Sequence, residues 1–384
     1  MAEWVECTIG DLCDTISDTY KGNDENVILV NTSDVLEGKV LNHIQVPNKN
    51  LKGQFKKTFR KNDILFSEIR PANKRFAFVD FEDTSNYIAS TKLMVLRHNE
   101  KVLPEYLFAI LKSNYILAEL QHLAETRSGT FPQITFTSEL APMKVNLPDK
   151  KTQKQIVSIL SSIEQKIDAN ESINDNLEQQ ARALYQRMFI DNPVSGGYMG
   201  TLSDIADITM GQSPNGSSYN EDGNGAVFFQ GRAEFGFRFP SVRLYTTEPK
   251  RMACANDTLM SVRAPVGDLN VAYTDCCIGR GLAAIHSKSN QQSFVLYTMF
   301  SLHKQLDVFN GEGTVFGSIN RTSLTELPIF IPLDREIVKF EAIVTPIDAA
   351  IRNNYEEICR LEKIRDALLP KLMSGELDVS AIEI

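Results

Sequence analysis

The chain has 384 residues, which suggests two or three domains at about 150 residues each, and its apolar (42%) and charged (23%) fractions are ordinary for a folded protein. These values exclude a wholly disordered or collagen-like chain, and the lack of an 18-residue apolar run speaks against a membrane span. The net charge of −9 argues mildly against nucleic acid as a partner, because duplex binding depends on neutralising phosphates.

Residues 1–150 read as a mixed domain of strands and helices. Short β-rich runs are separated by Gly, Asn, Asp and Pro, which are the residues of turns. We expect a helix near Pro104–Gln121 and strands at Val27–Val30, Asp63–Phe66, Phe76–Phe81 and Lys92–Leu96.

This first region contains a local basic segment despite the acidic total. Lys49 to Arg75 holds nine basic residues against two acidic ones, a net charge of +7. A second window, Arg232 to Arg251, holds five basic residues against two acidic ones. Each window is either a solvated face or a surface for phosphates.

A long helix is expected from Lys151 to Phe189, because no Gly or Pro interrupts it and apolar positions alternate in steps of 4 and 3. These seam positions are Ile156, Leu160, Ile163, Ile167, Asn170, Asn174, Leu177, Ala181, Leu184 and Met188. Adding 184 residues gives a second seam at Phe340, Val344, Ile347, Ile351, Asn354, Ile358, Leu361, Arg365, Leu368 and Leu372. Pro346 should kink this second helix or mark its start, and Pro370 should end or bend it.

Both seams carry a polar residue at the same repeat position, Asn170 and Asn354. A seam asparagine costs stability but fixes the register of a helix pair. We hypothesise that the two helices pack antiparallel and that Asn170 and Asn354 approach each other near a pseudo-two-fold axis. The alternative is that both side chains face solvent on a loosely packed seam.

The region after the linker 191–198 repeats the first region. We expect strands at Ala226–Gln230, Asp257–Val262 and Leu269–Tyr273 and a helix near Gln291–Val308. Thr8-Ile9-Gly10-Asp11-Leu12 matches Thr201-Leu202-Ser203-Asp204-Ile205, and Asn62-Asp63 matches Asn256-Asp257. An Arg and a Pro follow each copy (Arg70-Pro71; Arg263-Ala264-Pro265), as does a Gly-Thr turn at Gly129 and Gly313. The resulting organisation is a domain at 1–150, a helix at 151–190, a second domain at 199–333, a second helix at 334–373 and a tail at 374–384.

Motifs of self-contained catalysis are missing from the sequence. It has no GxxxxGK[ST], no HExxH, no metal-spaced Cys/His pair and no Asn-Pro-Pro-Tyr run. We therefore expect no catalytic residue and no metal site, although a carboxylate pair of a nuclease stays open. The six scattered cysteines and the acidic N-terminus without signal-peptide features favour reduced thiols and a cytoplasmic location.

Two similar domains separated by long helices suit a ligand with two recognition sites at a fixed distance. Duplex DNA is such a ligand, because its half-sites recur at about 34 Å per helical turn. Arg, Lys, Asn and Gln, which read base edges, are present in the expected loops.

The layout resembles the specificity subunit of a Type I restriction–modification system over essentially the whole chain. The matching motifs are the domain openings, Gly211-Gln212-Ser213-Pro214, the strand from Asp257 to Arg263, Gly279-Arg280-Gly281-Leu282, the Gly-Thr turns and the helix end from Leu368 to Glu376. The first copy departs from the pattern, because Asp18-Thr19-Tyr20-Lys21-Gly22 replaces the Gly-x-Ser-Pro of the second.

The resemblance implies an α+β protein with two pseudo-repeated target recognition domains joined by two long antiparallel coiled-coil helices. Each domain would read one half of a split, asymmetric DNA site. The helices would set the spacer and dock two modification (methyltransferase) subunits. Those subunits would carry S-adenosylmethionine, so that this chain has no cofactor, and restriction subunits would bind outside them.

For DNA contacts we select polar and basic residues of the two domains, each of which could instead be an ordinary surface residue. They are Lys56, Lys57, Arg60, Arg70, Lys74 and Arg75 in the first domain, and Gln212, Ser213, Asn215, Arg232, Arg243, Arg263, Arg280 and Arg321 in the second. We expect Arg263→Ala or Lys57→Ala to weaken binding to the site. The alternative functions are a self-contained DNA methylase or nuclease, and a coiled-coil scaffold protein.

Overall fold

The computed structural model describes residues 4–49, 51, 53–127, 132–192, 196–311 and 317–379. The expected Gly-Thr turns at Gly129 and Gly313, and residues 193–195 of the expected linker, lie outside this part. The chain divides into two compact units, Met1–Asp168 with Glu357–Ile384, and Ala169–Glu356. Both long helices therefore contribute residues to both units.

The first unit contains two four-stranded sheets and two short ribbons. One sheet has the order β2-β11-β8-β9 and the other the order β6-β3-β10-β7, while β1 pairs with β12 and β4 with β5. The strands are β1 Trp4–Thr8, β2 Cys13–Ile16, β3 Asn26–Val30, β4 Val35–Leu36, β5 Lys39–Val40, β6 Gln45–Pro47, β7 Phe55–Lys57, β8 Ile64–Ser67, β9 Phe76–Phe78, β10 Tyr87–Ser90, β11 Leu93–His98 and β12 Lys144–Pro148.

The second unit repeats this plan with β14-β22-β19-β20 and β15-β17-β16-β21-β18, and β13 pairs with β23. Its strands are β13 Tyr198–Thr201, β14 Ala206–Met210, β15 Tyr219–Asn220, β16 Ala226–Phe229, β17 Leu244–Thr246, β18 Met252–Ala253, β19 Thr258–Ser261, β20 Leu269–Val271, β21 Cys276–Ile278, β22 Leu282–Ser287 and β23 Pro328–Ile331. In each unit one parallel pair, β3 with β10 or β16 with β21, lies among antiparallel neighbours. The repeat read from the sequence is thus a repeat of topology.

The sheet that contains β8 or β19 is buried on both faces. In the first unit, Ile64 and Phe66 pack toward the helices, whereas Leu65 packs toward the second sheet. In the second unit, Met260 packs on the helical side and Leu259 on the sheet side. Burial on both faces explains why these strands read as continuous apolar runs.

Each of the two helices expected after the late strands is divided into shorter helices. The first is α1 Pro104–Leu111 followed by α2 Asn114–Arg127, and the second is α5 Gln292–Ser301 followed by α6 His303–Leu306. The second unit also has the short helices α4 Leu202–Ile205 and α7 Arg321–Thr325. The expectation of one continuous helix in each place was wrong. The first helix is interrupted between Leu111 and Asn114, and the second is interrupted at Leu302.

The repeated opening motif is a helix cap. Thr8 and Asp11 form a capping box around a short 3-10 turn, and Thr201 and Asp204 form the same box at α4. In both boxes the Asp carboxylate accepts the backbone N–H of the Thr, at 2.8 Å in the first and 2.7 Å in the second. The motif therefore sets the entry of each domain and carries no chemistry.

The long helices are α3 Lys150–Tyr185, followed by a π-helical turn over Gln186–Asp191, and α8 Asp334–Ser374. None of the twenty seam residues expected on them is exposed. Within the first unit, Lys166 of α3 pairs with Glu357 of α8, and the start of α3 shares a core with the end of α8. Within the second unit, the end of α3 shares a core with the start of α8. In both units the helix segments are therefore antiparallel.

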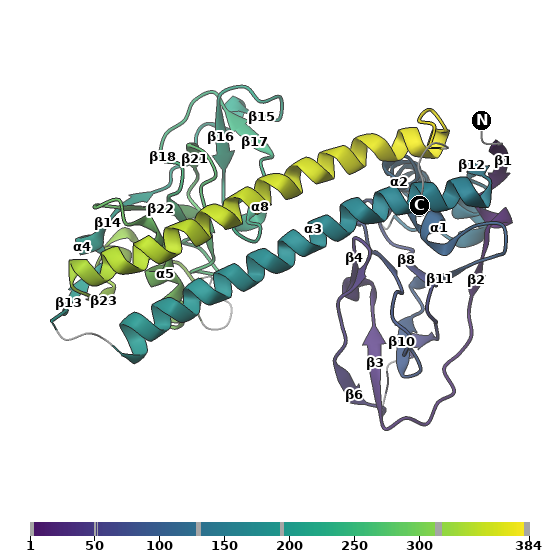
Figure 1. Ribbon diagram of the computed structural model, residues 1–384, viewed down its shortest axis with the longest axis horizontal. Coiled ribbons are helices and arrows are strands. Elements are labelled where there is room, and N and C mark those ends of the chain that lie inside the picture. Colours follow the sequence, from purple (N-terminus) through teal and green to yellow (C-terminus); the bar gives the residue numbers. More distant parts are fainter. Residues whose placement is uncertain are drawn as a thin grey trace. The chain divides into compact units, whose positions relative to one another are not determined.

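Neither proline delimits α8. The helix begins at Asp334, before Pro346, and continues beyond Pro370 to Ser374 (Figure 1). The alternatives that Pro346 marks the start of the helix and that Pro370 ends it were wrong, whereas a kink or bend at either proline stays a prediction. Packing of the seam supplies the stabilisation that outweighs the loss of one backbone hydrogen bond at each proline.

The seam contains a polar contact between asparagines. Asn354 Nδ2 donates to Asn174 Oδ1 at 2.8 Å, and Asn174 Nδ2 donates to the Ile351 carbonyl at 3.4 Å. Asn170 lies one helical turn before Asn174 and is 1% exposed. Neither Asn170 nor Asn354 faces open solvent, and the approach of Asn170 to Asn354 stays a prediction.

Two further observations concern the chain as described. No helix of the described residues is long and apolar enough to cross a membrane. All six cysteines are free thiols, and Cys13, Cys276 and Cys277 are buried.

Candidate nucleic-acid interface

Backbone hydrogen bonds gather four loops of the second unit that are far apart in sequence. Gly211 N–H donates to the Leu282 carbonyl at 2.9 Å, Val262 N–H to the Gly281 carbonyl at 2.9 Å, and Ala264 N–H to the Gly317 carbonyl at 3.0 Å. We call these segments, 211–215, 262–265, 279–281 and 317–321, the second loop cluster.

Glycine is required where these loops touch. A Cβ on Gly211 would lie 2.1 Å from the Gly279 carbonyl oxygen, and a Cβ on Gly281 would lie 2.9 Å from the Gln230 carbonyl oxygen. No side chain fits at the first distance, because both groups belong to the backbone and cannot move aside. The glycines of Gly211-Gln212-Ser213-Pro214 and Gly279-Arg280-Gly281 therefore permit the loops to pack. Gln212 and Arg280, which are next to these glycines, are exposed.

The second loop cluster presents exposed arginine and amide side chains. Within the described part of the chain, five of the selected residues are exposed and their side chains have no hydrogen-bond or ion-pair partner: Gln212, Asn215, Arg263, Arg280 and Arg321. Ser213 is half-buried, and its Oγ accepts the Arg280 N–H at 3.2 Å. Free guanidinium groups can take either phosphate oxygens or the base edges of guanine.

Arg232 and Arg243 are exposed but already paired. Arg232 donates to Asp268 at 2.5 Å and Arg243 to Glu234 at 2.8 Å. The hydrogen bond to Glu234 raises the pKa of Arg243 above its usual value. A phosphate must displace these carboxylates before it can bind either residue.

The first unit uses the same backbone contacts. Glu68 N–H donates to the Lys92 carbonyl at 3.0 Å, Arg70 N–H to the Pro132 carbonyl at 3.2 Å, and Ile134 N–H to the Glu68 carbonyl at 2.8 Å. We call the segments 68–75, 90–92 and 132–134 the first loop cluster.

The pairing also refines the match between the repeats. Ile69 bridges to Gln133, whereas Arg263 bridges to Ser318. Arg70 therefore occupies the position after that of Arg263, and the two arginines share a loop without sharing a backbone position.

Arg70 and Lys74 flank a tight turn of the first loop cluster. Both have left-handed backbones, with φ of 45° and 52°, on either side of the 3-10 turn Pro71–Asn73. Arg70 is exposed and its side chain has no partner among the described residues, while Lys74 pairs with Glu37 at 3.0 Å. Strained non-glycine residues of this kind concentrate at functional sites.

Two of the cations selected in the first unit hold the fold together. Lys57 Nζ donates to the carbonyls of Thr91 and Leu93 at 3.1 and 2.8 Å, and burial lowers the pKa of its ammonium. Arg75 donates to the Ser33 carbonyl at 3.0 Å. Lys56 and Arg60, in contrast, are exposed, and their side chains have no partner in the described part.

The departing loop of the first copy also lies elsewhere. Tyr20 N–H donates to the Lys56 carbonyl at 2.8 Å and Thr58 N–H to the Asp18 carbonyl at 2.9 Å. The loop around residues 18–22 thus pairs with β7, whereas its counterpart around Gly211 joins the second loop cluster.

The sequence did not identify Arg238, which anchors the second domain to the helices. Arg238 is 4% exposed and pairs with Glu178 of α3 at 3.0 Å and Asp348 of α8 at 3.2 Å. Its Nη2 also donates to the Tyr297 hydroxyl at 3.2 Å. Burial opposes the charge of Arg238, but Tyr297 and the two carboxylates together keep its pKa raised. Nothing in the local sequence distinguishes this arginine from its exposed neighbours.

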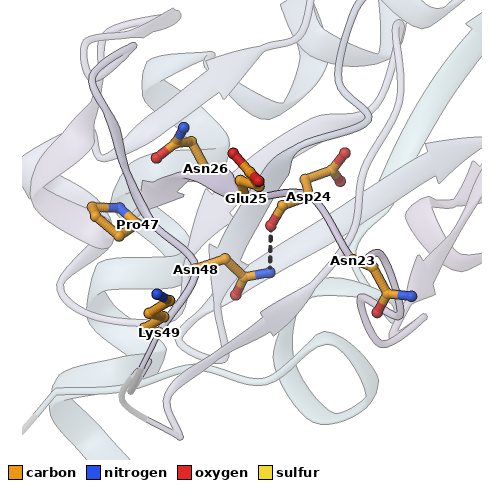
Figure 2. Close-up of a pocket in the computed structure, with 7 residues that line it drawn as sticks. All are labelled: Asn23, Asp24, Glu25, Asn26, Pro47, Asn48 and Lys49. Carbon is orange, nitrogen blue, oxygen red and sulfur yellow. Dashed lines mark hydrogen bonds between the residues drawn. The ribbon is translucent and has the colours of Figure 1, made fainter.

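A polar hollow of about 560 Å³ lies in the first unit, outside the loop cluster (Figure 2). It is lined by Asn23, Asp24, Glu25, Asn26, Pro47, Asn48 and Lys49. Asn48 Nδ2 donates to the Asp24 carbonyl at 3.0 Å, which links the two walls. Its amides and carboxylates form no nucleophile–base pair, and it contains none of the selected contact residues.

Comparison with known proteins identifies the family. The family model described as the Type I restriction modification DNA specificity domain matches residues 1–179. The Type I restriction enzyme HindI specificity subunit of Haemophilus influenzae is 31% identical over 462 aligned residues, which cover 98% of this chain and 100% of the relative.

A second relative is the putative Type I restriction enzyme MjaX specificity subunit of Methanocaldococcus jannaschii. It is 30% identical over 336 residues, covering 83% of this chain and 79% of the relative. The crystal structure of the Type-I restriction-modification system S subunit from M. genitalium shares the fold, with a TM-score of 0.56 at 16% identity, over 97% of this chain and 96% of that one. With its duplicated domains and its helix pair, this chain therefore belongs to the specificity subunits of Type I restriction–modification systems.

Proposed function

We propose that this chain is the non-catalytic subunit that reads the DNA sequence for a Type I restriction–modification complex. The observation that carries the proposal is that each copy of the duplicated domain presents an exposed arginine, Arg70 or Arg263, on equivalent loops, and that neither side chain has a partner among the residues that the structure describes. Family membership over the whole chain supports it. A duplicated reader suits a site made of two separate half-sequences.

Each unit reads one half of a split, asymmetric site in this proposal. The first loop cluster, with Lys56 and Arg60, contacts one half, and the second loop cluster contacts the other. Three selected residues, Arg232, Arg243 and Lys74, are already paired with carboxylates. On binding they exchange the carboxylate for a phosphate, which reduces their net contribution to the free energy of DNA binding. Lys57 and Arg75 support the fold beneath the first surface.

The helices have a second role in the proposal, which is to set the spacer and dock two modification subunits. Those subunits hold S-adenosylmethionine and methylate adenine, and restriction subunits bind outside them. An acidic DNA-binding chain is consistent with this arrangement, because its partners also contribute phosphate contacts.

Mapping of modified adenines tests the proposal. DNA is compared from cells that produce the modification subunits encoded with this chain, with and without the chain itself. We expect modification at one bipartite sequence only when the chain is present. Modification in cells that produce the chain without the modification subunits would indicate a self-contained methylase. Identical maps with and without the chain would instead favour a coiled-coil scaffold protein.

Gel shifts of the assembled complex test the loop clusters directly. Arg70→Ala and Arg263→Ala should each weaken binding to the mapped site. Lys101→Ala and Lys304→Ala are matched controls, because each removes an exposed positive charge outside the loop clusters and outside the two long helices. Equal losses in all four variants would refute the assignment of the loop clusters.

A further inference from the structure

Three potential metal ligands converge in the second unit, although the sequence analysis expected none. Cys254 Sγ, an Asp257 carboxylate oxygen and an imidazole nitrogen of His286 all lie within 4.8 Å of one another. Asp257 begins the segment that leads into β19, and His286 lies on the neighbouring strand β22. The residues are too far apart in sequence to form a spacing motif, so only the pairing of β19 with β22 reveals them.

The internal repeat supplies a reference for this cluster. In the first unit the same turn is built from Arg60 and Asp63, where the Arg60 N–H donates to Asp63 at 2.8 Å. In the second unit the Cys254 N–H donates to Asp257 at the same distance of 2.8 Å. The backbone role of the aspartate is therefore common to both copies, and the side chains around it differ.

The residue that contacts this aspartate from the neighbouring strand also differs between the two copies. Arg97 of β11 closes the first site with two hydrogen bonds to Asp63, at 2.8 and 2.7 Å. In the second copy His286 takes this place, and its Nδ1 lies 2.5 Å from Asp257 Oδ1. Two permanently charged arginines of the first copy are thus replaced by a thiol and an imidazole, both of which coordinate metals.

The chemistry of the three donors selects the class of ion. Sulfur, imidazole nitrogen and one carboxylate oxygen are ligands of Zn²⁺ and similar divalent transition metals, whereas Ca²⁺ and Mg²⁺ prefer oxygen alone. Donor atoms around tetrahedral zinc lie about 3.3–3.8 Å apart, so His286 Nδ1 and Asp257 Oδ1, which are 2.5 Å apart without an ion, must separate by about 1 Å when an ion binds. Asp257 is buried whereas Cys254 and His286 are exposed, so an ion can enter from solvent and keep one position for water.

The local electrostatics also favour a cation. Asp257 belongs to the cluster, and Asp275 lies beside it, since its carboxylate accepts the Ala255 N–H at 2.8 Å. A bound divalent ion would offset the negative charge of these carboxylates.

We propose that Cys254, Asp257 and His286 form a binding site for a zinc-class divalent metal ion that fixes the 254–257 turn to β22. The site is independent of the DNA-reading role and is confined to the second copy of the domain.

Metal binding by the purified full-length chain tests this proposal, with Co²⁺ as the spectroscopic probe and Zn²⁺ as the competitor. We expect about one Co²⁺ per chain, a sulfur-to-cobalt charge-transfer band, and displacement by Zn²⁺. Cys254→Ser should remove the band, and Cys254→Ser and His286→Ala should each weaken binding by about tenfold or more. Zn²⁺ should raise the Tm of the wild type and leave that of Cys254→Ser unchanged.

Two variants serve as controls. Cys359→Ser removes a thiol outside the site and should keep the full band. The double variant Cys254→Arg with His286→Arg restores the residue pair of the first copy, and it should fold without binding metal. A wild-type chain that binds neither ion, or a band that survives in Cys254→Ser, would overturn the proposal and leave Asp257 and His286 as a hydrogen-bonded pair.

Discussion

At the scale of single residues, charge alone does not identify a DNA contact. Arg263 and Lys57 both stand out as cations of the expected recognition loops, yet Arg263 is exposed without a side-chain partner while Lys57 bonds two backbone carbonyls. A cation that already satisfies buried acceptors cannot leave them without a cost in stability. The two residues therefore call for different expectations on mutation.

Arg263→Ala should weaken binding of the assembled complex to its site. The loss is about 1–3 kcal/mol if the guanidinium contacts a base. If it contacts a phosphate, affinity should fall uniformly across sequences, and the slope of log K against log salt should fall by about one. Titrations at several salt concentrations, on the mapped site and on a scrambled site, separate the two cases. Unchanged affinity on both would remove Arg263 from the interface.

Lys57→Met should act on stability instead. The variant keeps the aliphatic stem but leaves the Thr91 and Leu93 carbonyls without their donor, so the free energy of unfolding should fall by about 1–3 kcal/mol. Urea denaturation of the variant and of Lys56→Met, which loses an exposed charge on the same strand, makes the comparison. A folded Lys57→Met complex that loses site affinity at unchanged stability would contradict the structural role.

At the scale of elements, the seam between α3 and α8 combines apolar packing with one polar pair. The heptad pattern identified the seam correctly, because the step of 4 and 3 depends only on helical geometry. It did not identify the hydrogen bond between Asn354 and Asn174, because the register of two helices depends on how their side chains interlock.

The Asn174–Asn354 contact should behave as a coupled pair. Asn354→Leu alone leaves the half-buried contact with an unsatisfied Asn174 amide and should cost about 1–3 kcal/mol of stability. The double variant Asn174→Leu with Asn354→Leu should recover most of that loss. A double-mutant cycle by urea denaturation measures the coupling. Additive effects of the two substitutions would contradict a direct interaction.

The start of α3 should be sensitive to acid. Asp149 accepts the Thr152 N–H at 2.9 Å, and this hydrogen bond holds the pKa of the carboxyl below its usual value. A lowered pKa means that the contribution to stability is present above the unfolded pKa and is lost as pH falls through the folded pKa. Asp149→Ala should therefore cost about 1 kcal/mol at neutral pH.

The stability of Asp149→Ala should differ less from that of the wild type as the pH falls below the pKa of an ordinary aspartate. Thermal denaturation of both proteins between neutral pH and pH of about 3 tests this sign. Thr152→Val, which keeps the backbone donor, is the matched control and should retain the acid dependence. A Tm difference that is constant with pH would exclude the carboxylate as the cause.

At the scale of the whole molecule, the chain is a duplicated unit with unequal copies. The sheets, the capping boxes and the loop contacts recur, whereas the side chains on the loops differ. Divergence of surface residues on a constant core is what two readers of different half-sequences require.

Substitutions in the two units should therefore act independently. Arg70→Ala should relax or weaken recognition of one half-site, and Arg263→Ala that of the other. The double variant should lose the sum of the two free energies to within about 0.5 kcal/mol, because the residues belong to separate compact units. Affinities for sites altered in one half at a time provide the measurement. A single half-site affected by both variants would contradict the division of labour.

The sequence by itself determined the features that repeat along the chain: the duplication, the short strands and the helical seams. These features follow from local periodicity and composition, which can be read without knowledge of contacts. The prolines at 346 and 370 do not mark the ends of α8, because tertiary packing outweighs local propensity in a long helix.

Only the tertiary structure decided which charged side chains are free, since that depends on partners from distant segments. It placed Lys57 against Thr91 and Leu93, buried Arg238 between two helices, and brought Cys254 and Asp257 to His286. Hydrogen bonds and ion pairs form between atoms a few ångströms apart in space, and strand and helix pairing sets those distances rather than order along the chain.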